Sequence, residues 1–151
     1  MKRVVLALLA VLLVGGLVWA WLATAGTGYE EDHKTGYLED IRCDAVGRVY
    51  FPVWNGKYWE MRGEATSDAS EVIDFICLSS QLFVDGEESA SDNDCREDDD
   101  HAQTSVEQTW TNSWYEVCYK STHTFKIRST QGWKELVLRT TPCYASKGGQ
   151  P

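Results

Sequence analysis

Hydrophobic and polar side chains alternate most regularly between Thr124 and Arg139, on either side of Gln131-Gly132. A two-residue turn there pairs Arg128 with Glu135 and gathers apolar residues on one face, at Phe125, Ile127, Leu136 and Leu138. The opposite face is polar and charged, at Thr124, Lys126, Arg128, Glu135 and Arg139. Because a shift of one residue would turn every apolar side chain outward, the pattern predicts a β-hairpin with one buried face.

Another hairpin is predicted at Asn55-Gly56, a dipeptide typical of type I′ turns. A two-residue turn there pairs Trp54 with Lys57 and gathers apolar residues on one face, at Tyr50, Pro52, Trp54, Trp59 and Met61. We expect most of this face to be buried, with Trp54 as the member most exposed beside the turn. If it were exposed, the face would suit a flat apolar surface or a sugar ring, because aromatic side chains offer large contact areas.

Further strands are predicted between the two hairpins. Residues Glu71 to Val84 are rich in β-branched and aromatic side chains, with a break expected at Ser79-Ser80. Residues Thr104 to Lys120 supply one or two more strands, divided near Asn112-Ser113. No amphipathic helix is evident after residue 26. The fold class is therefore all-β: a small, disulfide-stapled antiparallel β-sandwich or partly open barrel of six to eight strands, over residues 41–146.

The N-terminus carries the pattern of an export segment and predicts one hydrophobic helix. Lys2 and Arg3 precede an uncharged stretch from Val4 to Ala25 that is long enough to cross a bilayer. Its length, with Trp19 and Trp21 near its end, favours a single-pass transmembrane anchor. The sequence Ala23-Thr24-Ala25 instead favours a signal peptide cleaved near Ala25 and a secreted protein. Either alternative, over residues 1–25, places the rest outside the cytoplasm, with a linker at 26–40 and a frayed tail at 147–151.

All five cysteines lie in the exported part, and none shows the C-x-x-C spacing of metal sites. Outside the cytoplasm, this usage indicates disulfides. We predict the disulfides Cys77–Cys95 and Cys118–Cys143, because each would close a short loop that leaves a predicted strand. Cys43 is then left over, either as a buried thiol or as a bond to a partner protein or a second copy of the chain, which would make a homodimer.

The charge is concentrated in one segment. The chain of 151 residues has a formal net charge of −9, which disfavours nucleic acid as a partner. Residues Asp85 to Asp100 contain nine acidic residues and one arginine. We expect a solvated acidic loop that keeps the domain soluble or meets a basic partner. The alternative is a Ca²⁺ site built from Asp92, Asp94, Asp98 and Asp100, although their spacing departs from the EF-hand pattern. No other cofactor is expected.

No motif identifies a reaction. The chain lacks a P-loop, an HExxH motif and a G-x-S-x-G elbow, and His123 lies among hydroxyl residues without any of them. We therefore predict no catalytic residues and a binding or interaction module at the cell envelope. Its partner would be a protein or a polysaccharide, contacted through Trp54 and Trp59 or through Asp98, Asp99 and Asp100. The alternatives are a small extracytoplasmic hydrolase or cation-binding protein, and a self-associating structural component of the envelope.

Overall fold

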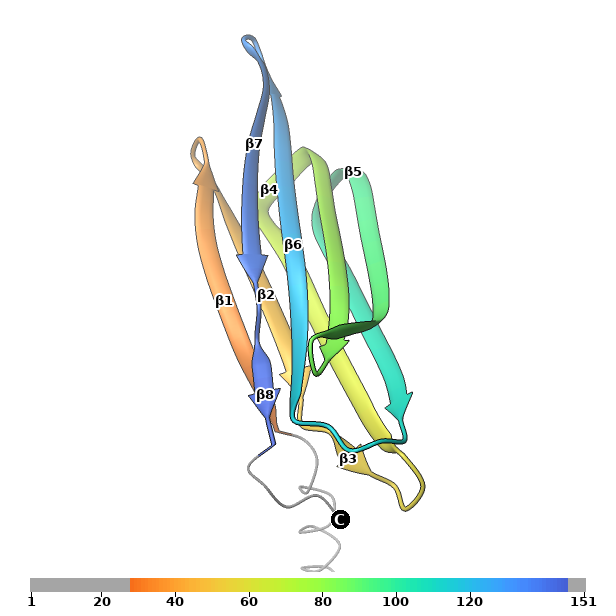
Figure 1. The fold of residues 1–151 in the computed structure, drawn as a ribbon. Helices are drawn as coiled ribbons and strands as arrows, with labels where there is room; N and C mark the ends of the chain where they lie inside the picture. The colour runs from red at the N-terminus through yellow and green to blue at the C-terminus, as the bar shows by residue number, and fades with distance from the viewer. Residues whose placement is uncertain (1–27, 147–151) are drawn as a thin grey trace, which may run out of the picture.

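The computed structural model describes residues 28–146, which form an all-β structure of eight strands with no helix in that range (Figure 1). The strands are β1 (Tyr29–Leu38), β2 (Ile41–Tyr50), β3 (Val53–Trp54), β4 (Trp59–Val84), β5 (Glu87–Trp110), β6 (Glu116–Ser129), β7 (Gly132–Thr140) and β8 (Cys143–Ala145). The predicted fold class and strand number are confirmed. The expected hydrophobic helix and tail lie outside the described residues. Within residues 28–146, no helix is long and apolar enough to span a membrane.

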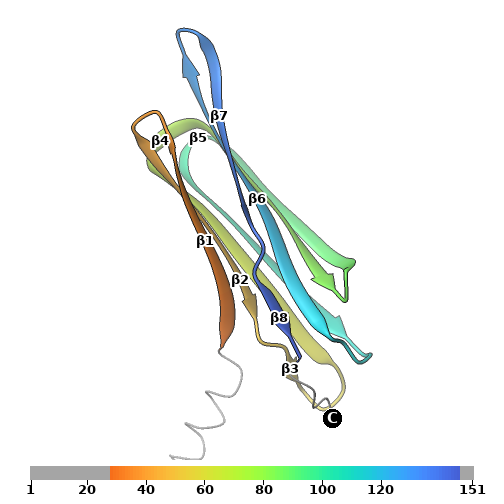
Figure 2. The ribbon, with the colours of Figure 1, turned by 60° about the vertical axis from the view of Figure 1, so that its left-hand side comes forward.

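Two long strands fold over together and close the sheet into a nearly complete barrel (Figures 1 and 2). Residues 63–69 of β4 pair with β2, and residues 59–68 pair with residues 101–110 of β5. Residues 75–84 of β4 pair with β6, and residues 73–84 of β4 pair with residues 87–99 of β5. The register between the strands shifts between Asp68 and Ile73, where the ribbon bends. The bend lets one hairpin contribute to both sides of the barrel, so of the two predicted architectures the structure has the partly open barrel, formed by one sheet of eight strands.

Along each strand, side chains point alternately into the barrel and outward. In β4 this alternation shifts by one residue at the bend. Odd-numbered residues of β4 point inward before the bend, as at Met61 and Ala65, and even-numbered residues after it, as at Ile76 and Leu78. Facing residues of β2 and β6 complete the core, at Cys43, Ala45, Val49, Val117, Tyr119 and Phe125. Because a strand has a period of two, only an irregularity such as this one can reverse the face that a continuous strand buries.

Carboxylates cover the two places where the barrel is not closed by strand pairing. Between the two halves of β5, Asp94 Oδ2 accepts a hydrogen bond of 3.0 Å from the Gln103 backbone N–H. Asp92 Oδ2 accepts one of 3.2 Å from the Ser105 backbone N–H. At the opposite seam, Asp32 Oδ2 accepts one of 3.0 Å from the backbone N–H of Thr141. Charged side chains at open edges discourage the pairing of further strands.

Both predicted hairpins form, but each register differs from the prediction by two residues. In the β6–β7 hairpin, Ser129 pairs with Gly132 and Lys126 with Glu135, so the turn residues are Thr130 and Gln131. Gly132 has a φ of 110° and stands at the end of the turn. A type I′ turn would have required a positive φ at Gln131 as well, whereas this arrangement requires it only at glycine. Because the difference is two residues, the predicted inner and outer faces are preserved.

The Asn55-Gly56 hairpin has a wider turn than predicted. Trp54 pairs with Trp59, and not with Lys57, so four residues form the turn. The Asn55 side chain accounts for the difference, because its Oδ1 accepts hydrogen bonds from the backbone N–H groups of Lys57 and Tyr58, each at 3.1 Å. Such Asx-type bonds stabilise a turn without a type I′ backbone.

Three other expectations are corrected. Strand β4 continues through Ser79-Ser80 without a break. The expected linker contains β1, which pairs with β2 over its whole length. The segment Asp85–Asp100 is not a loop: Asp85 and Gly86 form a tight turn with φ angles of 53° and 84°, and β5 follows. The dipeptide Asp-Gly is a strong hairpin signal, and the strand that pairs with β4 begins there. The predicted division near Asn112-Ser113 is confirmed, since β5 ends at Trp110 and β6 begins at Glu116.

Candidate functional site

Both predicted disulfides are present, and each joins two residues directly opposite one another on neighbouring strands. Cys77 of β4 is bonded to Cys95 of β5, and Cys118 of β6 to Cys143 of β8. Cys43 is fully buried, as the buried-thiol interpretation expects. Burial, followed by the neighbouring Asp44 carboxylate, raises the pKa of the Cys43 thiol to about 11. A bond from Cys43 to a second copy would therefore require the barrel to open. Disulfides are typical of oxidising compartments outside the cytoplasm.

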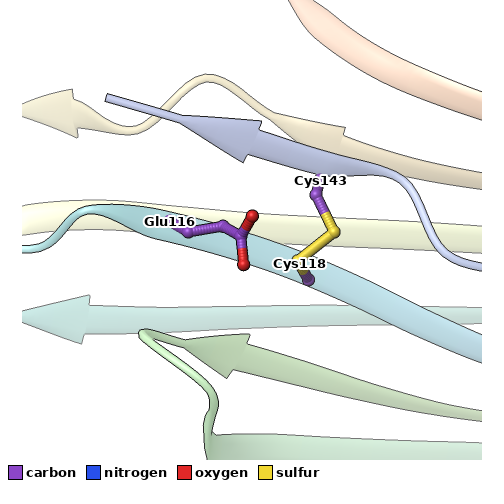
Figure 3. Close-up of side chains that lie close together, drawn as sticks. All are labelled: Glu116, Cys118 and Cys143. Atoms are coloured by element: carbon purple, nitrogen blue, oxygen red, sulfur yellow. A yellow bond between two sulfur atoms is a disulfide. The ribbon is translucent and has the colours of Figure 1, made fainter. Parts of the chain in front are cut away.

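One group of side chains resembles a metal site by proximity alone. The carboxylate of Glu116 and the sulfur atoms of Cys118 and Cys143 lie within 4.8 Å of one another. Figure 3 shows that the two sulfur atoms are bonded to each other. Because metal ligation needs thiolates, this group offers one carboxylate and no thiolate while the disulfide is intact.

Two of the aspartates predicted as a Ca²⁺ site form hydrogen bonds within the barrel. Asp92 and Asp94 bond to backbone N–H groups across the seam of the barrel. A hydrogen bond from Arg96 lowers the pKa of Asp94, which also accepts one from the Gln103 backbone. Among residues 28–146, no group of three carboxylates is close enough to hold one ion. The structure therefore does not bring Asp98 and Asp100 together with Asp92 and Asp94 as ligands.

The acidic segment instead displays its charge along an ordered strand. Glu87, Glu88, Glu97, Asp98 and Asp100 are exposed on β5. Hydrogen bonds from the backbone N–H groups of Asp100 and His101 lower the pKa of Asp99, so this carboxyl is ionised at neutral pH. The Cys77–Cys95 bond fixes the middle of the same segment to β4. Asp98, Asp99 and Asp100 thus lie where a partner can reach them, and their role in binding stays a prediction.

The interior contains a layer of six buried polar side chains that the sequence did not reveal. We call them the polar layer: Ser67, Ser80, Thr104, Ser121, His123 and Thr140. His123 Nδ1 lies 2.8 Å from Ser67 Oγ, and His123 Nε2 lies 3.0 Å from Thr140 Oγ1. Ser80 Oγ lies 2.7 Å from Thr104 Oγ1 and 2.9 Å from Ser121 Oγ. Every member of the layer therefore has a partner inside the barrel.

Burial prevents the polar layer from acting as a catalytic site. Desolvation lowers the pKa of His123 to about 4, so its imidazole is neutral at physiological pH. Ser67 and His123 resemble a nucleophile and base by their distance, but each is fully buried. A substrate could not approach the Ser67 hydroxyl without opening the barrel. The arrangement satisfies polar groups in the core, as buried polar side chains generally require.

β1 begins and β5 ends at the same end of the barrel (Figures 1 and 2), and aromatic residues are frequent in the segments that meet there. We call this the aromatic end: Tyr29, Phe51, Trp54, Trp59, Trp114, Tyr115 and Tyr144. Ring centroids are 5.4 Å apart for Trp54 and Trp59, and 5.6 Å apart for Trp59 and Trp114. Trp54 is 39% exposed and is the most exposed member of the predicted hairpin face, whereas Met61 on that face is buried. The expectation for Trp54 is therefore confirmed.

Two shallow grooves lie on the outer surface. One, of about 570 Å³, is lined by aromatic and polar residues that include Tyr50, Tyr58 and Arg62. The other, of about 560 Å³, adjoins the acidic part of β5 and is lined by Glu97, Asp98 and Trp133, among others. Lys126 and Arg128 also line the second groove, so it combines both signs of charge with an aromatic wall.

Comparison with known proteins gives no family. No family model and no curated protein matches the chain. A crystal structure of a protein from Archaeoglobus fulgidus is similar at 10% identity, over 80% of this chain and 98% of that one, with a TM-score of 0.28. A likeness at this level carries no argument about fold or function.

Proposed function

We propose that this chain is an extracytoplasmic interaction domain, held at the membrane by residues 4–25, that binds a protein with a basic surface through β5. The observation that carries the proposal is the exposed acidic side chains on an ordered strand. Nine acidic residues and one arginine occupy residues 85–100, in a chain whose net charge is −9. A charged surface that is already ordered gives complementary partners faster and more selective association.

The remaining features of the molecule agree with a binding role. The seam beside β5 is closed by Asp92 and Asp94, so partners meet side chains and not an unpaired strand edge. The two disulfides support the proposed location outside the cytoplasm. The groove beside Glu97 and Asp98 also contains Trp133, which offers an aromatic contact beside the charges.

The test uses the full chain in membranes isolated from its native cells. A photo-crosslinking amino acid replaces Asn93, an exposed, uncharged residue of β5. The neutralised variant carries Glu97→Gln, Asp98→Asn and Asp100→Asn. The matched control removes the same charge from exposed positions elsewhere, with Glu30→Gln, Asp40→Asn and Glu71→Gln.

We expect one dominant crosslinked product that weakens as salt is added, because screening reduces attraction between surface charges. The neutralised variant should lose this product, and the matched control should keep it. If both variants keep the product, or both lose it equally, β5 is not the binding surface.

A further inference from the structure

The aromatic end forms a continuous set of ring contacts that starts beside the N-terminal segment. Gly28, the first described residue, accepts a backbone hydrogen bond of 2.9 Å from Phe51. The ring of Phe51 stacks on Tyr144 with centroids 4.4 Å apart, and Tyr144 lies 5.9 Å from Trp114. Contacts through Trp59 then lead to Trp54. The most exposed tryptophan at this end is thus linked to the place where the chain enters the barrel.

The length of chain before the barrel limits how far this end can lie from a membrane. The apolar segment ends at Ala25, and only residues 26–28 separate it from Tyr29. Even a fully extended chain covers only about 14 Å over that interval. The interfacial region of a bilayer is itself roughly 6 Å thick on each side. If residues 4–25 cross the bilayer, the aromatic end therefore lies at the lipid headgroups.

The composition of the exposed turns also fits a lipid surface. The turn from Asn55 to Tyr58 and the connection from Thr111 to Tyr115 contain no acidic residue, although the chain is strongly acidic. The adjacent carboxylate of Asp85 accepts hydrogen bonds from the backbone N–H groups of Tyr115 and Glu116. Lys57 supplies a positive charge beside Trp54. Tyr115 is 77% exposed and Tyr29 is 46% exposed. Trp, Tyr and Lys are the residues that favour the boundary between lipid and water.

We propose that the aromatic end rests on the lipid headgroups, with Trp54 and Tyr115 inserted at the interface. This proposal rests on the proposed function, because it requires residues 4–25 to remain as an anchor. The contact fixes the orientation of the domain as well as its distance from the membrane. In this orientation the hairpin between β6 and β7, at the opposite end of the barrel, points away from the bilayer (Figure 2), and Trp133 lies in β7 next to its turn.

The test is fluorescence quenching of the full chain in vesicles of phosphatidylcholine and phosphatidylglycerol whose acyl chains carry bromine near the headgroup. Trp19→Phe and Trp21→Phe are introduced first, so that emission comes from the barrel. Trp54→Phe is then compared with Trp133→Phe, which removes a tryptophan that is 54% exposed at the far end. Both changes keep an aromatic ring, and circular dichroism checks that the fold is retained.

We expect bromine to quench the emission, with quenching about twofold weaker in Trp54→Phe. In Trp133→Phe the quenched fraction should be unchanged or slightly higher, because the tryptophan removed is not quenched. Vesicle flotation of the same samples tests the anchor separately. If the chain floats with the vesicles and Trp54→Phe leaves quenching unchanged, the headgroup contact is wrong and the anchored domain stands. If the chain does not float, the anchor and the contact are both wrong.

Discussion

The polar layer and the aromatic end lie in the same barrel but differ in their exposure to solvent. The polar layer is sealed from solvent, and its hydroxyl and imidazole groups bond to one another. The aromatic end begins with the buried Trp114 and ends with the exposed Trp54 and Tyr115. The Ser67–His123 pair, which resembles a nucleophile and its base, therefore stabilises the core. Trp54 and Tyr115, which are of residue types common in cores, are exposed at the surface.

This difference shows why residue type alone misassigns function in a small β-barrel. A Ser–His pair needs an accessible substrate site before it can act as nucleophile and base. Aromatic side chains stabilise a core when buried, but they offer a binding surface when exposed. Exposure decides between these roles, and exposure depends on the ends and seams of the barrel.

Among the changes compared, His123→Ala is expected to lower the free energy of unfolding the most. The change leaves a cavity and removes the imidazole partner of Ser67 and Thr140, and we expect a loss of roughly 4 kcal/mol in the free energy of unfolding. The matched control is His101→Ala, which removes a half-exposed imidazole paired with Asp68 and should cost less than about 1 kcal/mol. Urea unfolding measures both. Equal losses would show that the polar layer is not a stabilising unit.

A somewhat smaller effect is expected from pH. The pKa of His123 is about 4 in the folded state, against its usual value of 6.5. The unfolded chain therefore takes up a proton at a pH where the folded chain does not, so stability is complete above about pH 6.5 and falls as the pH drops toward 4. The full loss is about 3 kcal/mol. In His123→Gln, which has no imidazole to titrate, this part of the pH dependence should vanish in urea unfolding. An unchanged slope would assign the pH dependence to other groups.

The smallest stability effect is expected from Trp54→Ala. The side chain is partly exposed and contacts mainly Trp59, so the free energy of unfolding should fall by about 1 kcal/mol or less. By contrast, Trp114→Ala removes a buried ring and should cost about 3 kcal/mol or more. Thermal unfolding compares the two. If Trp54→Ala were as damaging as Trp114→Ala, Trp54 would belong to the core and not to a contact surface.

Local patterns in the sequence predicted the faces of the hairpins, the two disulfides and the exposure of Trp54. They predicted the registers less well, because the Asn55 side chain and the single positive φ at Gly132 select turns other than type I′. The buried positions of β4 are odd-numbered at Ala65 and even-numbered at Ile76, and this shift was a visible signal of the bend in β4. The turn at Asp85-Gly86 was another signal, and it marks the start of β5.

The polar layer could not be predicted from local patterns. Ser67 and His123 are 56 residues apart in sequence, and neither residue carries a local sign of the partner that it meets in the core. Only the pairing of distant strands places their side chains opposite one another, where each satisfies the other. The aromatic end was partly visible in the hairpin at Trp54, but Trp114 and Tyr144 join it through the fold.

The most direct test of the account compares Tyr115 with Tyr37 by hydroxyl-radical labelling of the full chain in vesicles. Tyr115 belongs to the aromatic end and is 77% exposed, and Tyr37, near the end of β1 where the chain turns into β2 at the opposite end, is 65% exposed. Exposure in the barrel alone would make Tyr115 the more oxidised of the two. Contact with the lipid headgroups reverses this order, with Tyr115 oxidised several-fold less than Tyr37 because the headgroups cover it. Oxidation of Tyr115 at or above the level of Tyr37 would contradict it.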